Sequence, residues 1–269
     1  RARGMALFSY REHRFRILPG GKSLSLSLLL MGGVRSRDRP CLPPRRRFVS
    51  HRAATDAARD RRNTMSFTYK RLDKNDAAVL FVDHQAGLLS LVRDFSPDEF
   101  KNNVLALADI ARFFNLPTIL TTSFEDGPNG PLVPELKEMF PQAPYIARPG
   151  NINAWDNEDF VKAVKATGKK QLIIAGVVTD VCVAFPTLSA LEEGFDVFVV
   201  TDASGTFNPV VRDAAWARMT AAGAQLMNWF SVGCELHRDW RNDIEGFGAI
   251  LGGHLPAYAN LIQSFGTKK

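Results

Sequence analysis

The feature that most constrains the fold is a regular alternation of short apolar runs and amphipathic segments after residue 76. Residues 77–82 are apolar throughout, as is typical of a strand buried on both faces of a parallel sheet. A helix-start signal follows at 96–99, where Ser precedes Pro-Asp-Glu. Strict alternation with short links favours right-handed crossovers, which place helices on both faces of one parallel sheet.

This alternation predicts an α/β fold: a three-layer α/β/α, Rossmann-like, doubly wound sheet of six mainly parallel strands in the order 3-2-1-4-5-6. The expected strands are 77–82, 117–122, 145–148, 171–177, 195–201 and 224–230. The expected helices start near 97 and cover 157–166, 182–193, 209–222 and a region near 234–244. Strands one and four then meet at the switch point, where ligands bind beyond the strand ends.

Charge is unevenly distributed along the 269 residues. Residues 1–64 carry 16 Arg and Lys against 4 Asp and Glu, a net charge of +12, whereas 65–269 carry 18 against 24, a net charge of −6. The acidic body argues against nucleic-acid binding, which favours a basic face. No apolar run reaches the roughly 18 residues that span a bilayer, and three cysteines are too few for a disulfide scaffold. We expect a cytoplasmic protein with neither nucleic acid nor membrane as a partner.

The basic segment 1–64 shows no sustained strand or helix periodicity. A targeting peptide and a secretory signal each fit it in part. The interpretation we favour is a disordered leader, from upstream translation or an expression scar, in front of one domain at 65–269. A basic tail that binds acidic surfaces is a weaker alternative.

Three chemically useful side chains fall at strand ends: Asp83 after strand one, Arg148 at the end of strand three and Cys182 after strand four. Because neighbouring strands lie about 4.8 Å apart, we expect Asp83 beside Cys182, with Arg148 within reach. A helix start and a nearby cation would favour the thiolate of Cys182, since the ordinary pKa of a thiol is about 8.5. Asp83 is then a candidate base, and backbone N–H groups near 178–182 are candidates to hold an oxyanion.

Each of these residues also has a purely structural interpretation. A strand-end Asp can form a turn, a Cys can pack inertly in the core, and an Arg usually lies on the surface. His84 either lines the pocket or helps to fold the turn. Cys41 lies in the leader and Cys234 is expected to be packing. The five histidines show no metal-ligand spacing, so we predict neither a metal nor another cofactor.

The chain resembles the isochorismatase-like cysteine hydrolases, and most closely their YcaC-type branch. The likeness rests on Val82-Asp83-His84-Gln85, on the run from Ala147 to Trp155 and on Gly176-Val177-Val178-Thr179-Asp180-Val181-Cys182. It covers essentially all of 65–269, including the segments 201–207 and 235–240. The resemblance implies a Rossmann-like fold and an Asp–Lys–Cys triad, with Asp83 as base and Cys182 as nucleophile.

Arg148 stands where the family has lysine. Arginine stays protonated, so it can hold a carboxylate or polarise a carbonyl but does not readily donate a proton. The family also implies a cis peptide bond, here at Val177–Val178, and an oxyanion held by N–H groups of Val178 and Cys182. Pocket candidates are Gln85, Asn153, Trp155, Thr179 and Phe185, with Asn153 and Thr179 ranked above the aromatic residues. Nicotinamidase relatives bind a metal through Asp and two His, but 121–127 here contain no His.

The resemblance thus implies a hydrolase that cleaves the C–N bond of a small amide through a thioester, with an Asp-Arg-Cys site. It also implies a homo-oligomer, an octamer of two rings. The alternative is a non-catalytic oligomeric ligand-binding or sensor protein on the same fold. In that case Arg148, in place of the family's lysine, indicates a site that is no longer catalytic. A dinucleotide-binding oxidoreductase fits the fold alone, because residues 83–87 lack the Gly-x-Gly-x-x-Gly phosphate loop.

Overall fold

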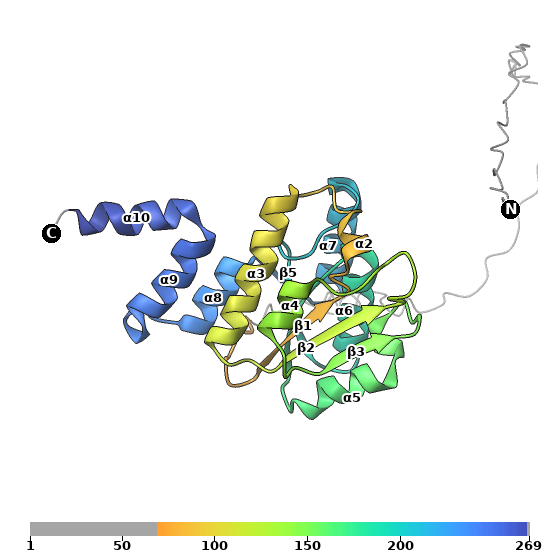
Figure 1. Ribbon diagram of the computed structural model, residues 1–269. Coiled ribbons are helices and arrows are strands. Elements are labelled where there is room, and N and C mark those ends of the chain that lie inside the picture. The colour runs from red at the N-terminus through yellow and green to blue at the C-terminus, as the bar shows by residue number, and fades with distance from the viewer. Residues whose placement is uncertain (1–68, 268–269) are drawn as a thin grey trace, which may run out of the picture. The chain divides into compact units, whose positions relative to one another are not determined.

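The computed structural model describes residues 69–267, so the predicted leader at 1–64 lies outside the described residues. Six parallel strands form one sheet in the order β3-β2-β1-β4-β5-β6 (Figure 1). The predicted fold class and strand order are confirmed. The strands are β1 Ala77–Val82, β2 Thr118–Ser123, β3 Tyr145–Arg148, β4 Gln171–Gly176, β5 Asp196–Val200 and β6 Gln225–Met227.

Helices cover both faces of the sheet. α3 contacts α4, α8 and α9 in one outer layer, while α6 contacts α7 in the other. The bounds are α2 Ala86–Leu89, α3 Pro97–Phe113, α4 Pro134–Met139, α5 Glu158–Ala166, α6 Ala184–Glu192, α7 Pro209–Ala221, α8 Trp229–His237, α9 Ile244–His254 and α10 Pro256–Gly266. Between 69 and 267, no helix is long and apolar enough to cross a membrane.

The local sequence explains most element boundaries. Every residue of β1, β2 and β4 is buried, which accounts for the apolar or small side chains that dominate these runs. α3 begins at Pro97 because the Ser96 side chain accepts a hydrogen bond from the N–H of Glu99, 3.4 Å away. Gly168, Gly194 and Gly223 each adopt a positive φ just after a helix, where glycine avoids steric strain.

The structure corrects several predicted boundaries. The sixth strand is only Gln225–Met227, because the Asn228 side chain accepts from the Ser231 N–H and starts α8 at Trp229. The helix expected near 234–244 is instead the end of α8 and the turn before α9. Residues 179–183 form a π-helical turn, so α6 begins at Ala184, two residues after Cys182. α2, α4, α9 and α10 were not predicted.

The switch point between β1 and β4 requires close approach of two backbones. Val82 pairs with Gly176 across these strands, and the Val177 N–H donates to the Val82 carbonyl at 3.1 Å. A Cβ atom placed on Gly176 would lie 2.4 Å from that carbonyl oxygen. Because a backbone atom cannot swing aside as a flexible side chain can, only glycine fits here.

We therefore expect Gly176→Ala to lower the free energy of unfolding by at least about 1–3 kcal/mol, the usual range for overpacking. Gly150→Ala is the matched control, because a Cβ atom there meets nothing within 4 Å. Denaturant titration of the full chain measures both. Equal stability of the two variants would contradict the tight contact at the switch point.

Candidate active site

Asp83 follows β1 at the carboxyl edge of the sheet and is fully buried. Its φ of 57° lies in the left-handed region, which Asp tolerates better than most residues. The backbone is held there by a hydrogen bond from the Asp83 N–H to the Thr121 carbonyl at 2.9 Å. The strand therefore ends in a sharp turn that leaves the carboxylate inside the protein.

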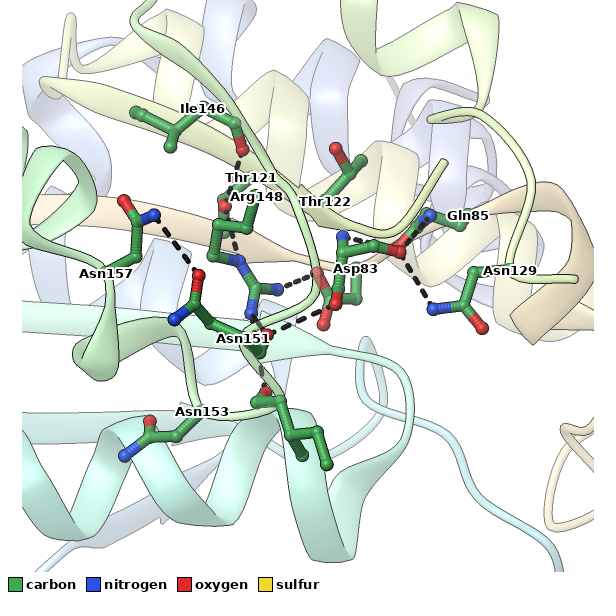
Figure 2. Close-up of polar contacts among 12 residues, drawn as sticks. Asp83, Gln85, Thr121, Thr122, Asn129, Ile146, Arg148, Asn151, Asn153 and Asn157 are labelled. Carbon is green, nitrogen blue, oxygen red and sulfur yellow. Dashed lines mark hydrogen bonds and ion pairs between the residues drawn. The ribbon is translucent and has the colours of Figure 1, made fainter. Parts of the chain in front are cut away.

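Arg148 ends β3 and is 1% exposed, yet it carries a full charge. Its Nη2 forms a buried ion pair with Asp83 Oδ1 (Figure 2). Nε donates to Thr121 Oγ1 at 3.0 Å, and Nη1 donates to the carbonyls of Asn151 and Ile152. A guanidinium has five N–H groups, so at most one remains for another partner.

Burial raises the pKa of Asp83, while the charge and hydrogen bond of Arg148 act in the opposite direction. Arg148 thus helps to keep a buried carboxylate ionised. The other carboxylate oxygen, Oδ2, is buried and has no hydrogen-bond partner among residues 69–267. This oxygen is available to receive a proton.

Cys182 lies in the turn after β4 and is 9% exposed. β4 pairs directly with β1, so Asp83 and the turn that carries Cys182 follow neighbouring strands, as the sequence predicted. The Val177–Val178 peptide bond before this turn is cis. The N–H of Thr179 donates to the Gly205 carbonyl at 3.0 Å, while its buried hydroxyl has no partner within the described residues.

The expectation of a thiolate favoured at rest was wrong. Burial raises the pKa of Cys182, and the nearby charge of Asp83 raises it further. A backbone hydrogen bond from Val178 and the charge of Arg148 oppose this with smaller effects. Desolvation therefore outweighs the helix start and the cation, and the pKa of Cys182 lies above its ordinary value.

The other predicted pocket residues have structural hydrogen bonds. Gln85 is fully buried and joins the loops after β1 and β2, since its amide bonds the Ser123 backbone and the Gly130 carbonyl. Asn153 accepts from the Trp155 N–H and donates to Ser189 Oγ at 3.1 Å. The Trp155 indole donates to Glu193 at 2.8 Å. Their assignment to substrate binding stays a prediction, as does that of Phe185, whose ring lies under Arg218.

Thr121 and Asn151 belong to the site but were not predicted from the sequence. Thr121 Oγ1 donates to the Ile146 carbonyl at 2.8 Å and accepts from Arg148, so it links β2 to β3 next to the ion pair (Figure 2). The Asn151 carbonyl accepts from Arg148 and, at 3.1 Å, from Ser123 Oγ. The role of a backbone carbonyl cannot be predicted from the identity of its residue. Thr121 could not be singled out either, because β-branched residues are common in strands.

Metal ligands do not gather in the part of the chain that the structure describes: no group of three or more His, Cys, Asp or Glu side chains there is placed to hold an ion. The charged side chains that meet at Cys182 are Asp83 and Arg148, and they are paired with each other. The chemistry available at this site is therefore that of a thiol and a carboxylate.

Comparison with known proteins gives a family for this arrangement. The family model of the isochorismatase domain matches residues 77–230. The chain belongs to the isochorismatase family. Probable hydrolase YcaC of Escherichia coli is 77% identical over 203 residues, which are 76% of this chain and 98% of that protein. This isochorismatase-family chain is therefore a hydrolase.

The solved structure of the same Escherichia coli protein and one more distant relative extend the comparison. The crystal structure of Escherichia coli YcaC, described as an octameric hydrolase of unknown specificity, has a TM-score of 0.74 and 76% identity, and covers 76% of this chain and 100% of that one. Nicotinamidase 3 of Arabidopsis thaliana is 23% identical over 188 residues, 62% of this chain and 92% of that protein.

The raised pKa of Cys182 leads to a test in solution. We expect alkylation of Cys182 by iodoacetamide to increase with pH around a midpoint above about 8.5, the ordinary pKa of cysteine. Asp83→Asn removes a negative charge beside the thiol, so it should move the midpoint down. Peptide mapping follows the reaction, with a short unstructured cysteine peptide as reference. A wild-type midpoint below that of the peptide would contradict this description.

Proposed function

We propose that this isochorismatase-family hydrolase cleaves the C–N bond of a small uncharged amide through a thioester on Cys182. The observation that carries the proposal is the placement of Cys182 and Asp83 after neighbouring strands, with an Asp83 Oδ2 that has no hydrogen-bond partner among residues 69–267. A thiol becomes a strong nucleophile when a neighbouring base takes its proton. The curated nicotinamidase relative carries the name of an amide hydrolase, which supports the choice of bond.

In the proposed first half-reaction, Cys182 Sγ attacks the amide carbon while its proton passes to Asp83. Asp83 then protonates the leaving nitrogen, and ammonia or an amine departs as the C–N bond breaks. In the second half-reaction, water adds to the thioester and gives a proton to Asp83. Cys182 leaves and recovers that proton, so acid and free enzyme result.

The N–H groups of Val178 and Cys182 are the proposed oxyanion donors. The N–H of Thr179 already donates to Gly205, which takes it out of this role. The Thr179 hydroxyl, buried and without a partner in the described region, is a proposed contact to the amide group. A substrate that bonds to this hydroxyl gives a buried polar group the partner it lacks, and this contributes to binding.

Arg148 is a positioning residue in this proposal. At least four of its five N–H groups hold Asp83, Thr121 and the Asn151–Ile152 carbonyls. It therefore has little capacity to bind a substrate carboxylate, and its charge is balanced by Asp83. A charged substrate would lose its hydration without gaining a partner, so the site favours uncharged amides.

Ammonia release from a panel of amides tests the proposal. We expect turnover of some uncharged members, such as propionamide, benzamide or nicotinamide, in preference to carboxylate-bearing analogues such as succinamate. Cys182→Ala should reduce turnover at least about 10³-fold, and Asp83→Asn about 10²–10⁴-fold. An acyl adduct on the Cys182 peptide should be seen by mass spectrometry during turnover.

Cys234→Ala is the matched control, because Cys234 lies in α8, far along the chain from the site, and should retain full activity. Turnover that survives Cys182→Ala would overturn the mechanism. If no amide is hydrolysed but one still binds equally well to Cys182→Ser, the sensor interpretation replaces the enzymatic one.

We also propose that the chain forms a homo-octamer, as YcaC of Escherichia coli does. α10 is a candidate contact surface, because none of its residues is buried and Leu261 and Ile262 are 62% and 46% exposed. It packs on α9 at the end of the domain farthest from the strands in Figure 1. Exposed apolar side chains gathered on one helix mark an interaction surface.

We expect Leu261→Glu to reduce the molar mass of the assembly, because a charge in an apolar interface loses its hydration. Gln263→Glu adds the same charge at a neighbouring exposed position of α10 and should leave the mass unchanged. Sedimentation equilibrium of the full chain measures both. An octamer that persists in Leu261→Glu would remove α10 from the interface.

A further inference from the structure

A cavity lies among residues that the proposed reaction does not use. It has a volume of about 570 Å³ and is enclosed by α2, the 90–96 segment, the first half of α3 and the start of α4. Eight of its thirteen lining residues are apolar: Ala86, Leu89, Val92, Pro97, Phe100, Val104, Leu105 and Val133. Its size and apolar lining are those of a small-molecule site, and neither Asp83, Arg148 nor Cys182 lines it.

His84 lines this cavity and supplies a specific polar group. Its Nε2 lies 3.1 Å from the Ala203 carbonyl. Because a carbonyl oxygen can only accept, Nε2 carries the proton, and Nδ1 of the neutral ring is a bare acceptor. Burial lowers the pKa of His84 to about 4, so the ring is neutral at physiological pH. Nδ1 is buried and has no partner among residues 69–267.

The charged residues of the lining are already engaged. Lys101 forms an ion pair with Glu135 at 2.5 Å, and Nη1 of Arg93 donates to the carbonyls of Ser90 and Val92. Because an ionised carboxylate only accepts hydrogen bonds, it cannot donate to Nδ1. The group that Nδ1 requires is a neutral donor.

The cavity is in packing contact with the turn that carries the nucleophile. A Cβ atom on Gly205 would lie 2.7 Å from Val92 and 3.1 Å from Phe100, both of which line the cavity. The Gly205 carbonyl accepts from Thr179, and its N–H donates to the Gly176 carbonyl at 3.3 Å. A molecule that displaces Val92 or Phe100 therefore presses on the backbone next to Cys182.

We propose that this cavity binds a small uncharged molecule with an apolar body and one hydroxyl group, an alcohol or a phenol, whose hydroxyl reaches and donates to the covered Nδ1 of His84 when the cavity lining shifts aside. The apolar wall takes the body of the molecule, and the lone pair of His84 determines its orientation. This inference is independent of the reaction proposed for Cys182, since Asp83, Arg148 and Cys182 do not line the cavity.

Calorimetry with 4-propylphenol and 4-propyltoluene tests the proposal. The two probes differ only by a methyl group in place of the hydroxyl, so apolar burial alone would favour the toluene. We use the full chain carrying Cys182→Ala, which removes the thiol as a competing site of interaction. The phenol should bind at least roughly tenfold more tightly than the toluene, because only the phenol can donate a hydrogen bond to the buried acceptor.

Two variants locate the binding. Leu105→Trp places a larger side chain in the cavity wall and should abolish binding, whereas Leu91→Trp, at a 39% exposed position outside the lining, should not. His84→Phe should remove the preference for the hydroxyl while the apolar body still binds.

Equal affinity for the two probes would overturn the assignment of His84, and binding that survives Leu105→Trp would overturn the assignment of the cavity. Failure of the phenol to bind the assembled protein would also overturn it, because a second copy of the chain would then cover the cavity.

Discussion

The buried ion pair between Asp83 and Arg148 holds the site together. Removing two charges from water is costly, and the cost is recovered only when their remaining hydrogen-bonding groups are satisfied. Arg148 meets this condition through Thr121 and the Asn151 and Ile152 carbonyls. The end of β1, strand β2 and the loop after β3 are thereby joined around one guanidinium, whose charge opposes the rise that burial causes in the pKa of Asp83.

Much of the fold could be predicted because its signals are local. Fully buried strands appear in the sequence as apolar runs, and Ser96-Pro97 indicates the start of α3. The strand order follows from alternation and crossover handedness, which are properties of the chain's connectivity. Once β1 and β4 are neighbours, Asp83 and Cys182 must meet at the same edge of the sheet, so their proximity could also be predicted.

The remaining features depend on tertiary surroundings. The pKa of Cys182 is raised by burial and by Asp83, and neither effect is visible in a helix-start signal. β6 ends early because Asn228 caps α8, although Trp229 and Phe230 are good strand residues. Nδ1 of His84 carries no proton because Nε2 donates to the Ala203 carbonyl. Ala203 lies 119 residues away in the chain. α10 lacks buried residues, so no core-facing pattern identifies it.

The pairing of Val82 with Gly176 also affects the order in which the protein can fold. β1 can pair with β2 across a short stretch of chain, whereas its pairing with β4 must close a loop of more than ninety residues. Long loops form slowly, because their closure entropy is lost before the contact is gained. The thiol and its base therefore meet only when the two halves of the sheet join, and an incompletely folded chain carries an ordinary cysteine.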